Sequence, residues 1–182
     1  MQTRKVDSMR ARFVNEDIKD FFKPKSEEEI WSSVGNLNPN QLLRKSAKLG
    51  FLPGVTKAIE DGADIHASED EALRYASENG HYAIVKLLLN NRASVHTNND
   101  AALRYASSKG HYDIVALLLD NGADVHAVAD YALRYASNNG HYNVVALLLD
   151  NGADVHADND WALRLASQAG HDDVVELLKK YI

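Results

Sequence analysis

A period of thirty residues constrains the fold of this chain more than any other feature. A leucine followed by an arginine recurs at this spacing five times, and a glycine recurs in the same register. A period of roughly 20–50 residues is typical of stacked structural repeats, because one unit cannot bury its own apolar surface and needs its neighbours. We therefore predict the units 40–69, 70–99, 100–129, 130–159 and a shorter fifth unit, 160–182.

The sequence pattern of each unit predicts two helices. The theme D-x-A-L-R-Y-A-S-x-x-G-H-Y predicts a short first helix, with the aspartate accepting hydrogen bonds from the free N–H groups of its first turn. The glycine ends that helix, and an apolar stripe such as Ile84–Leu89 predicts a second helix. The segment GADVHA is expected to be an extended loop. The predicted fold class is all-α, a solenoid of stacked helix-turn-helix units with short connecting hairpins or loops and an N-terminal helical cap.

Residues 1–39 precede the repeats and form the predicted cap. Apolar residues recur about every four positions within residues 6–22, as in an amphipathic helix. Ser26 and Glu29 have the spacing of a capping box that opens a second short helix, and Asn38-Pro39 marks the start of the repeats. This leader either covers the apolar face of the first repeat or serves as a docking or oligomerisation helix. Membrane-surface binding is disfavoured, because the helix lacks a dominant basic face.

The run ALRYASNNGHYNVVALLLDNGADVHA at 132–157 resembles an ankyrin repeat, and the resemblance extends over residues 40–182. It implies two antiparallel helices and a projecting finger per unit, with protein binding on the concave side formed by finger tips and first helices. The units are shorter than the family's usual length of about 33 residues. We therefore expect stubby fingers and a contact surface shifted toward the first helices. The D-x-A-L-R style resembles repeats of large viruses and phages.

The charge distribution favours some partners over others. The chain has a formal charge of −6, and residues 100–159 hold eight acidic but only three basic side chains. This excess disfavours nucleic acid, which needs clustered Lys and Arg, and predicts a protein partner with a basic face. The chain has no cysteine and no apolar run long enough to span a membrane. We expect no membrane association and a cytoplasmic location, or the host-cell cytoplasm if the protein is viral.

The histidines and arginines recur with the repeats, so we interpret both as structural. All eight histidines lie fifteen residues apart, half the period, with one at the turn between the helices and one in the connecting segment. Neighbouring repeats place equivalent residues about 8–10 Å apart, which is too far for two ligands of one zinc ion without rearrangement. The arginines are expected to bind carbonyls or a neighbouring aspartate. We predict no metal site, no cofactor and no catalytic residue, hence no enzyme.

Positions that vary among near-identical repeats are the candidates for partner binding. Large aromatic residues occupy two of them, Tyr131 and Trp161, where other repeats have Glu or Ala, so the core does not demand them. Packing between repeats and neutral drift are the alternatives. Arg92 is a further candidate, because it replaces a glycine expected to be left-handed. The other candidates are Glu71, Asn98, Asn99, Ala101, Val128, Asp158 and Asn159.

The predicted function is non-catalytic. We expect a module that binds a protein partner through the concave face of repeats three to five, and that could inhibit or sequester it. The alternative is a structural or self-assembling component joined through the N-terminal amphipathic helix. We expect a monomer, with an oligomer formed through residues 6–22 as the alternative.

Overall fold

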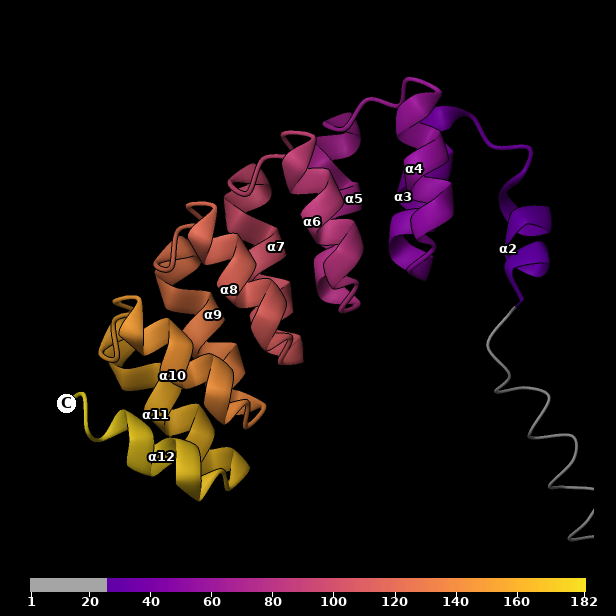
Figure 1. The fold of residues 1–182 in the computed structure, drawn as a ribbon. Helices are drawn as coiled ribbons and strands as arrows, with labels where there is room; N and C mark the ends of the chain where they lie inside the picture. The colour runs from indigo at the N-terminus through magenta and orange to yellow at the C-terminus, as the bar shows by residue number, and fades with distance from the viewer. Residues whose placement is uncertain (1–25) are drawn as a thin grey trace, which may run out of the picture. The chain divides into compact units, whose positions relative to one another are not determined.

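The computed structural model describes residues 26–182, and its contacts divide the chain into two units, Met1–Gly35 and Asn36–Ile182 (Figure 1). In the first unit, helix α2 (Glu27–Val34) begins with the predicted capping box. The Ser26 hydroxyl accepts the Glu29 N–H, and the Glu29 carboxylate accepts the Ser26 N–H. The amphipathic helix predicted within residues 6–22 lies outside the described residues. That the leader covers the first repeat therefore stays a prediction.

The second unit is a row of five helical hairpins, which Figure 1 shows from purple α3 and α4 to yellow α11 and α12. Every regular element within residues 26–182 is a helix, which confirms the predicted all-α stack. The first helices of the hairpins are α3 (Pro39–Leu49), α5 (Ala67–Glu78), α7 (Thr97–Lys109), α9 (Ala127–Asn138) and α11 (Ala157–Ala169). The second helices are α4 (Leu52–Glu60), α6 (Tyr82–Asn90), α8 (Tyr112–Asp120), α10 (Tyr142–Asp150) and α12 (Asp172–Leu178).

The core of the row combines the small and the branched residues of the repeated theme. Leu103 and Ala106 of α7 are fully buried, as are Val115 and Leu118 of α8. Alanine lets helices approach closely, and successive first helices pack on one another much more extensively than successive second helices do. The first helices therefore form the inner row of the stack, and the second helices form its outer row.

The start of four inner helices, α5, α7, α9 and α11, differs from the predicted extended loop. Three consecutive residues adopt the left-handed conformation, with φ between 50° and 58°. Non-glycine residues seldom adopt it, because Cβ crowds the carbonyl, and a β-branched residue such as Val128 does so least readily. The expectation of an extended segment is therefore wrong at this end of the loop. These left-handed turns are residues 68–70, 98–100, 128–130 and 158–160.

Candidate functional site

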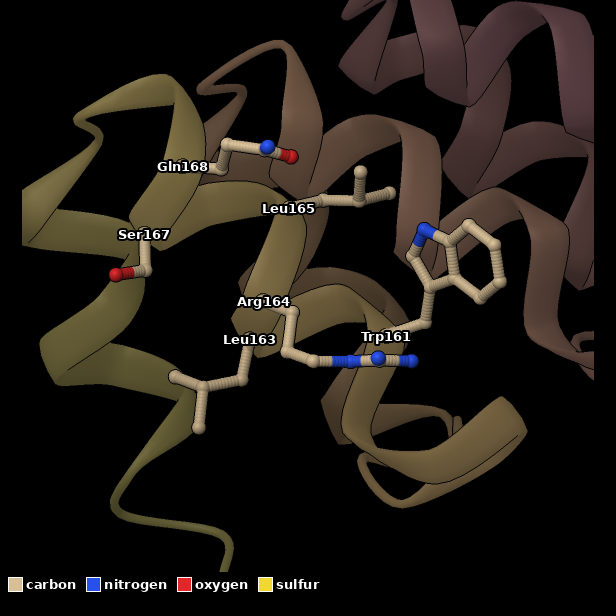
Figure 2. Close-up of a pocket in the computed structure, with 6 residues that line it drawn as sticks. All are labelled: Trp161, Leu163, Arg164, Leu165, Ser167 and Gln168. Carbon is tan, nitrogen blue, oxygen red and sulfur yellow. The ribbon is translucent and has the colours of Figure 1, made fainter.

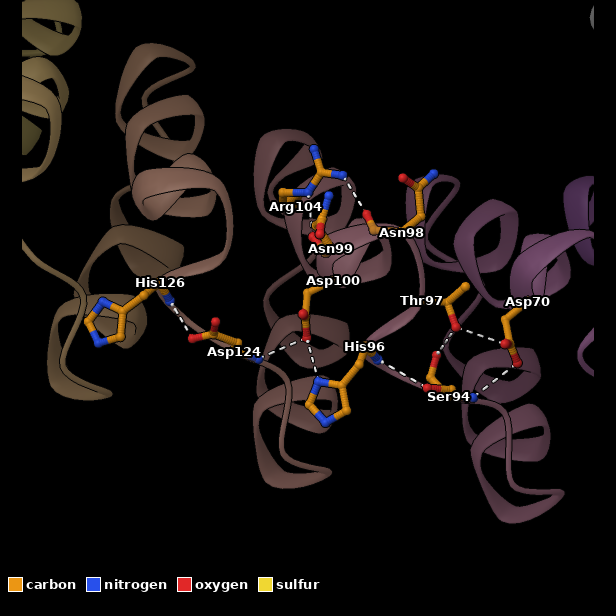
Figure 3. A network of polar contacts seen from close by, with 10 residues as sticks. All are labelled: Asp70, Ser94, His96, Thr97, Asn98, Asn99, Asp100, Arg104, Asp124 and His126. Atoms are coloured by element: carbon orange, nitrogen blue, oxygen red, sulfur yellow. Dashed lines mark hydrogen bonds and ion pairs between the residues drawn. The ribbon is translucent and has the colours of Figure 1, made fainter.

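In repeats three to five, the repeated arginine of the inner helix bonds the left-handed turn of its own repeat. Arg104 donates from Nε to the Asn99 carbonyl and from Nη2 to the Asn98 carbonyl, both at 2.8 Å (Figure 3). Arg134 donates in the same way to the Val128 carbonyl at 2.8 Å. Hydrogen bonds to a charged donor contribute about 1.5–3 kcal/mol each and offset the left-handed strain. The structural interpretation of these arginines is confirmed, and the first two side chains of each turn lie at the surface.

The repeated aspartate closes the junction with the following loop. Asp100 is 5% exposed, and its Oδ1 accepts the Asp124 N–H at 2.9 Å and the His96 Nδ1–H at 3.2 Å (Figure 3). Asp70 has the same role toward the Ser94 N–H and also accepts the Thr97 hydroxyl. These bonds join consecutive connecting loops. The prediction that the aspartate caps the first turn is wrong, because the residue is left-handed and its carboxylate turns toward the next loop.

The two histidine series are both structural, as predicted. One series lies in the connecting segment, where Nδ1 contacts the carboxylate of the left-handed turn four residues later, as His126 contacts Asp130 at 3.1 Å. The other begins the outer helix, where Nε2 donates to a carbonyl in the inner helix of the preceding repeat, as His141 does to Ser108 of α7 at 3.1 Å. Within residues 26–182 no group of three His, Cys, Asp or Glu side chains lies close enough to hold a metal ion.

Aromatic rings and guanidinium groups alternate along the inner row. The Tyr131 ring centroid lies 5.2 Å from Arg104 Cζ and 5.9 Å from Arg134 Cζ. Arg134 Cζ also lies 5.8 Å from the Trp161 ring centroid, and Arg164 Cζ lies 5.3 Å from it. Such cation–π pairs contribute about 0.5–1 kcal/mol each when exposed. Each of the two aromatic candidates therefore contacts the arginine of its own repeat and the arginine of the preceding repeat.

Tyr135 extends this cluster and is a residue that the sequence interpretation missed. Its ring stacks on Tyr131 with centroids 4.0 Å apart and planes at 17°. Burial, with a contribution from Tyr135, raises the pKa of Tyr131 above its ordinary value. The spacing of four residues was the available signal, because it places two side chains on one face of a helix.

Trp161 borders an open hollow at the last repeat. The indole is 40% exposed and contributes to a concavity of about 630 Å³ whose other lining residues also come from α11. Figure 2 shows Arg164 extending beside the indole and Leu165 on the same side of the helix. A partly exposed tryptophan with an apolar neighbour and a guanidinium group is the type of site that accepts a side chain of a protein partner.

This geometry is a repeated helical hairpin with an exposed inner row, and the sequence comparison identifies its family. The family model described as ankyrin repeats (three copies) matches residues 43–129 and 127–182. The chain belongs to the ankyrin-repeat family. Comparison with curated protein sequences gives no significant match. Ankyrin repeats are generally protein–protein interaction modules, typically without catalysis. Within residues 26–182 no helix has the length and apolar character needed to cross a membrane.

The residues predicted from the sequence to bind a partner differ in exposure and in their contacts within the ankyrin repeats. Ala101 is only 2% exposed and is thus not available to a partner, contrary to the expectation for a variable position. Glu71 is already paired with Arg44 at 3.2 Å and Arg74 at 3.0 Å. Tyr131 and Trp161 lie on the inner row, as expected from the sequence. The exposed candidates in the left-handed turns are Asn98, Asn99, Val128, Asp158 and Asn159, of which Asp158 also pairs with Arg134 at 2.8 Å.

Arg92 follows helix α6 with φ of 68°, which confirms the predicted left-handed backbone. The equivalent residues Gly62, Gly122 and Gly152 have φ between 84° and 89°. We expect Arg92→Gly to raise the free energy of unfolding by about 0.5–1 kcal/mol, because glycine adopts this conformation without Cβ strain. A thermal melt should then shift upward by about 1–4 °C. An unchanged or lower melting temperature would show that the arginine relieves the strain through other contacts.

Proposed function

We propose that this chain is a non-catalytic module that binds a protein partner through the inner row of ankyrin repeats three to five. The observation that carries the proposal is Trp161, an exposed aromatic residue whose ring contacts both Arg134 and Arg164. Rigid, preorganised aromatic residues lose little conformational entropy on binding and dominate interface energies. Tyr131 and Tyr135 extend the same surface into repeat four. We expect the module to act in the cytoplasm, or in that of a host cell if the protein is viral.

Removing the two aromatic candidates should weaken binding strongly. We expect Tyr131→Ala combined with Trp161→Ala to raise the partner Kd at least about thirtyfold, which corresponds to about 2 kcal/mol. The partner is first isolated by affinity capture, and its Kd is then measured by isothermal titration calorimetry.

The control is Tyr142→Ala, which removes an exposed ring from the outer helix α10. The control should leave Kd within about twofold. Unchanged affinity of the Tyr131/Trp161 variant would contradict the proposed surface. If that variant unfolds, the two rings belong to the core and the proposal is again wrong.

We also propose that the partner presents a basic surface. The support is the charge of residues 100–159, which hold eight acidic and three basic side chains. We expect the association rate constant to fall as salt rises from about 50 to 300 mM, because this range shortens the Debye length strongly. Stopped-flow mixing of the protein with its captured partner measures this rate. A rate constant that is independent of salt would argue against a basic surface.

A further inference from the structure

The outer helices of the middle repeats carry two related grooves. In the first, Tyr82 of α6 faces the α8 residues Asp113, Ala116, Leu117 and Asp120. In the second, Tyr112 of α8 faces the α10 residues Asn143, Ala146, Leu147 and Asp150. The two sets occupy the same positions of the thirty-residue period and differ at one of them, where Asp113 corresponds to Asn143.

The two grooves are lined by the same types of residue at their main positions. Each has a half-exposed tyrosine on one side, an alanine and a leucine at its base, and a carboxylate at the C-terminal end of the facing helix. Tyr112, for example, is 46% exposed. Exposed aromatic rings beside small residues leave room for a long side chain, and the ring face attracts a cation.

The carboxylates of these grooves lack cationic partners. No Lys or Arg side chain of residues 26–182 forms an ion pair with Asp113 or Asp120, both of which are exposed. Asp150 accepts the Tyr181 hydroxyl at 2.9 Å through Oδ1 alone. By contrast, the inner-row carboxylates Glu71 and Asp158 are paired with arginines. The uncompensated negative charge of the middle repeats thus lies partly on the outer row.

The neighbouring outer helix limits this acidic strip. At the position of Ala116 and Ala146, helix α6 has the exposed Lys86. A lysine there fills the equivalent space and repels another cation. The strip that can accept a cation therefore extends over α8 and α10 rather than over the whole stack.

We infer that the outer row of repeats three and four binds a basic segment of another protein, with one lysine or arginine side chain in each groove between a tyrosine ring and a carboxylate. The aliphatic part of that side chain lies on the alanine and leucine, and its charged end reaches Asp120 or Asp150. The inference rests on the proposed function only in the basic character of the partner. It concerns a surface separate from Tyr131 and Trp161.

The spacing of the grooves defines the segment that fits them. Adjacent packed helices are about 8–10 Å apart. An extended chain rises about 3.3 Å per residue, so neighbouring grooves are spanned by about three residues. The segment that fits best is therefore extended and has basic residues at every third position.

A synthetic peptide tests this inference without the natural partner. The probe is a fluorescein-labelled peptide with lysine at every third position separated by Ser-Gly, and the reference peptide has glutamine in place of each lysine. With the full chain at about 50 mM salt, we expect saturable binding of the lysine peptide only, measured by fluorescence anisotropy. Backbone amide shifts in an NMR titration should be concentrated in residues 113–120 and 143–150.

Charge-matched variants separate the grooves from the overall charge of the protein. Asp113→Asn, Asp120→Asn and Asp150→Asn together should weaken binding at least about tenfold. Glu27→Gln, Glu28→Gln and Glu69→Gln remove the same charge from exposed positions elsewhere and should change binding less than about threefold. Tyr82→Leu combined with Tyr112→Leu keeps apolar bulk but removes the aromatic rings, and should weaken binding about two- to fivefold for each ring.

Four outcomes would overturn the inference. They are no saturable binding of the lysine peptide, equal losses in the two carboxylate triples, NMR shifts centred on the inner row, and preserved binding in the Asp113/Asp120/Asp150 variant. The NMR map uses the unaltered protein, so it remains decisive if a variant fails to fold. Because the Tyr131/Trp161 variant keeps these grooves, it should bind the peptide normally. The two proposals can therefore fail separately.

Discussion

Asp130→Ala is expected to lower the free energy of unfolding by about 3–4 kcal/mol, one of the two largest effects expected for this chain. Asp130 is 4% exposed, and its Oδ1 accepts the Asp154 N–H at 2.9 Å and the His126 Nδ1–H at 3.1 Å. Alanine removes both bonds and leaves a partly buried N–H without its partner, and it also tolerates the left-handed conformation less well than aspartate. Urea unfolding followed by circular dichroism measures the change.

Asp160→Ala is the matched control for this prediction. Asp160 has nearly the same backbone conformation, with φ of 58° against 53° for Asp130. Alanine therefore has about the same left-handed strain at both positions. The Asp160 side chain is 48% exposed, and within residues 26–182 it bonds only His156. We expect a loss of about 1 kcal/mol. Asp130→Asn keeps a neutral acceptor and should fall between the two. Equal losses at Asp130 and Asp160 would show that the bond between consecutive loops contributes little.

Gly110→Ala should be comparably destabilising, by about 3 kcal/mol. Gly110 ends helix α7 with φ of 77°, and an added Cβ would lie 2.6 Å from Nδ1 of His141 in the next repeat. The alanine therefore has left-handed strain of about 1–2 kcal/mol and also displaces a ring that bonds the Ser108 carbonyl. Urea unfolding again measures the loss.

Gly122→Ala separates these two causes. Gly122 has φ of 89°, but nothing lies within 4 Å of an added Cβ, so only the backbone strain of about 1–2 kcal/mol applies. A second comparison uses His141→Ala. This substitution should lower the free energy of unfolding less in the Gly110→Ala background than in the wild type, because removing the imidazole there also removes its clash with the alanine Cβ. Additive losses, or equal losses at Gly110 and Gly122, would refute the proposed contact between glycine and histidine.

The sequence predicts the helices well, because their signals are local. The leucine, alanine and glycine of each unit determine the ends and buried faces of the helices, and Ser26 with Glu29 predicts the start of α2 correctly. The role of the aspartate was mispredicted for a physical reason. Its partner is a backbone N–H 24 residues later, as in the bond from Asp124 to Asp100, and a backbone group has no sequence signature. The left-handed turn at Val128 and Ala129 opposes residue preference, so it could not be predicted from propensity.

The candidate site is predicted only in part from the sequence, because exposure and contacts between repeats depend on the fold. Variation among repeats identifies Tyr131 and Trp161 as residues that the core does not require, and both lie on the inner row. Variation does not report exposure, and Ala101 is variable but buried. The carboxylate grooves of the outer row were also missed, although the charge of residues 100–159 indicated acidity. That Tyr82 and Asp120 line the same groove can be known only from the arrangement of neighbouring helices in space.

The bonds between neighbouring repeats make the length of this protein easy to change. At each junction, the histidine that precedes an outer helix donates to a carbonyl 33 residues earlier and lies against the glycine of that preceding repeat. The aspartate of repeats two to four accepts a backbone N–H of the following loop, 24 residues later. A thirty-residue segment copied in tandem would find complementary surfaces at both of its ends without further substitutions. Duplication or deletion of one repeat would thus extend or shorten the inner row by one helix spacing, about 8–10 Å. A family of such proteins could adjust its reach to partners of different size in whole steps.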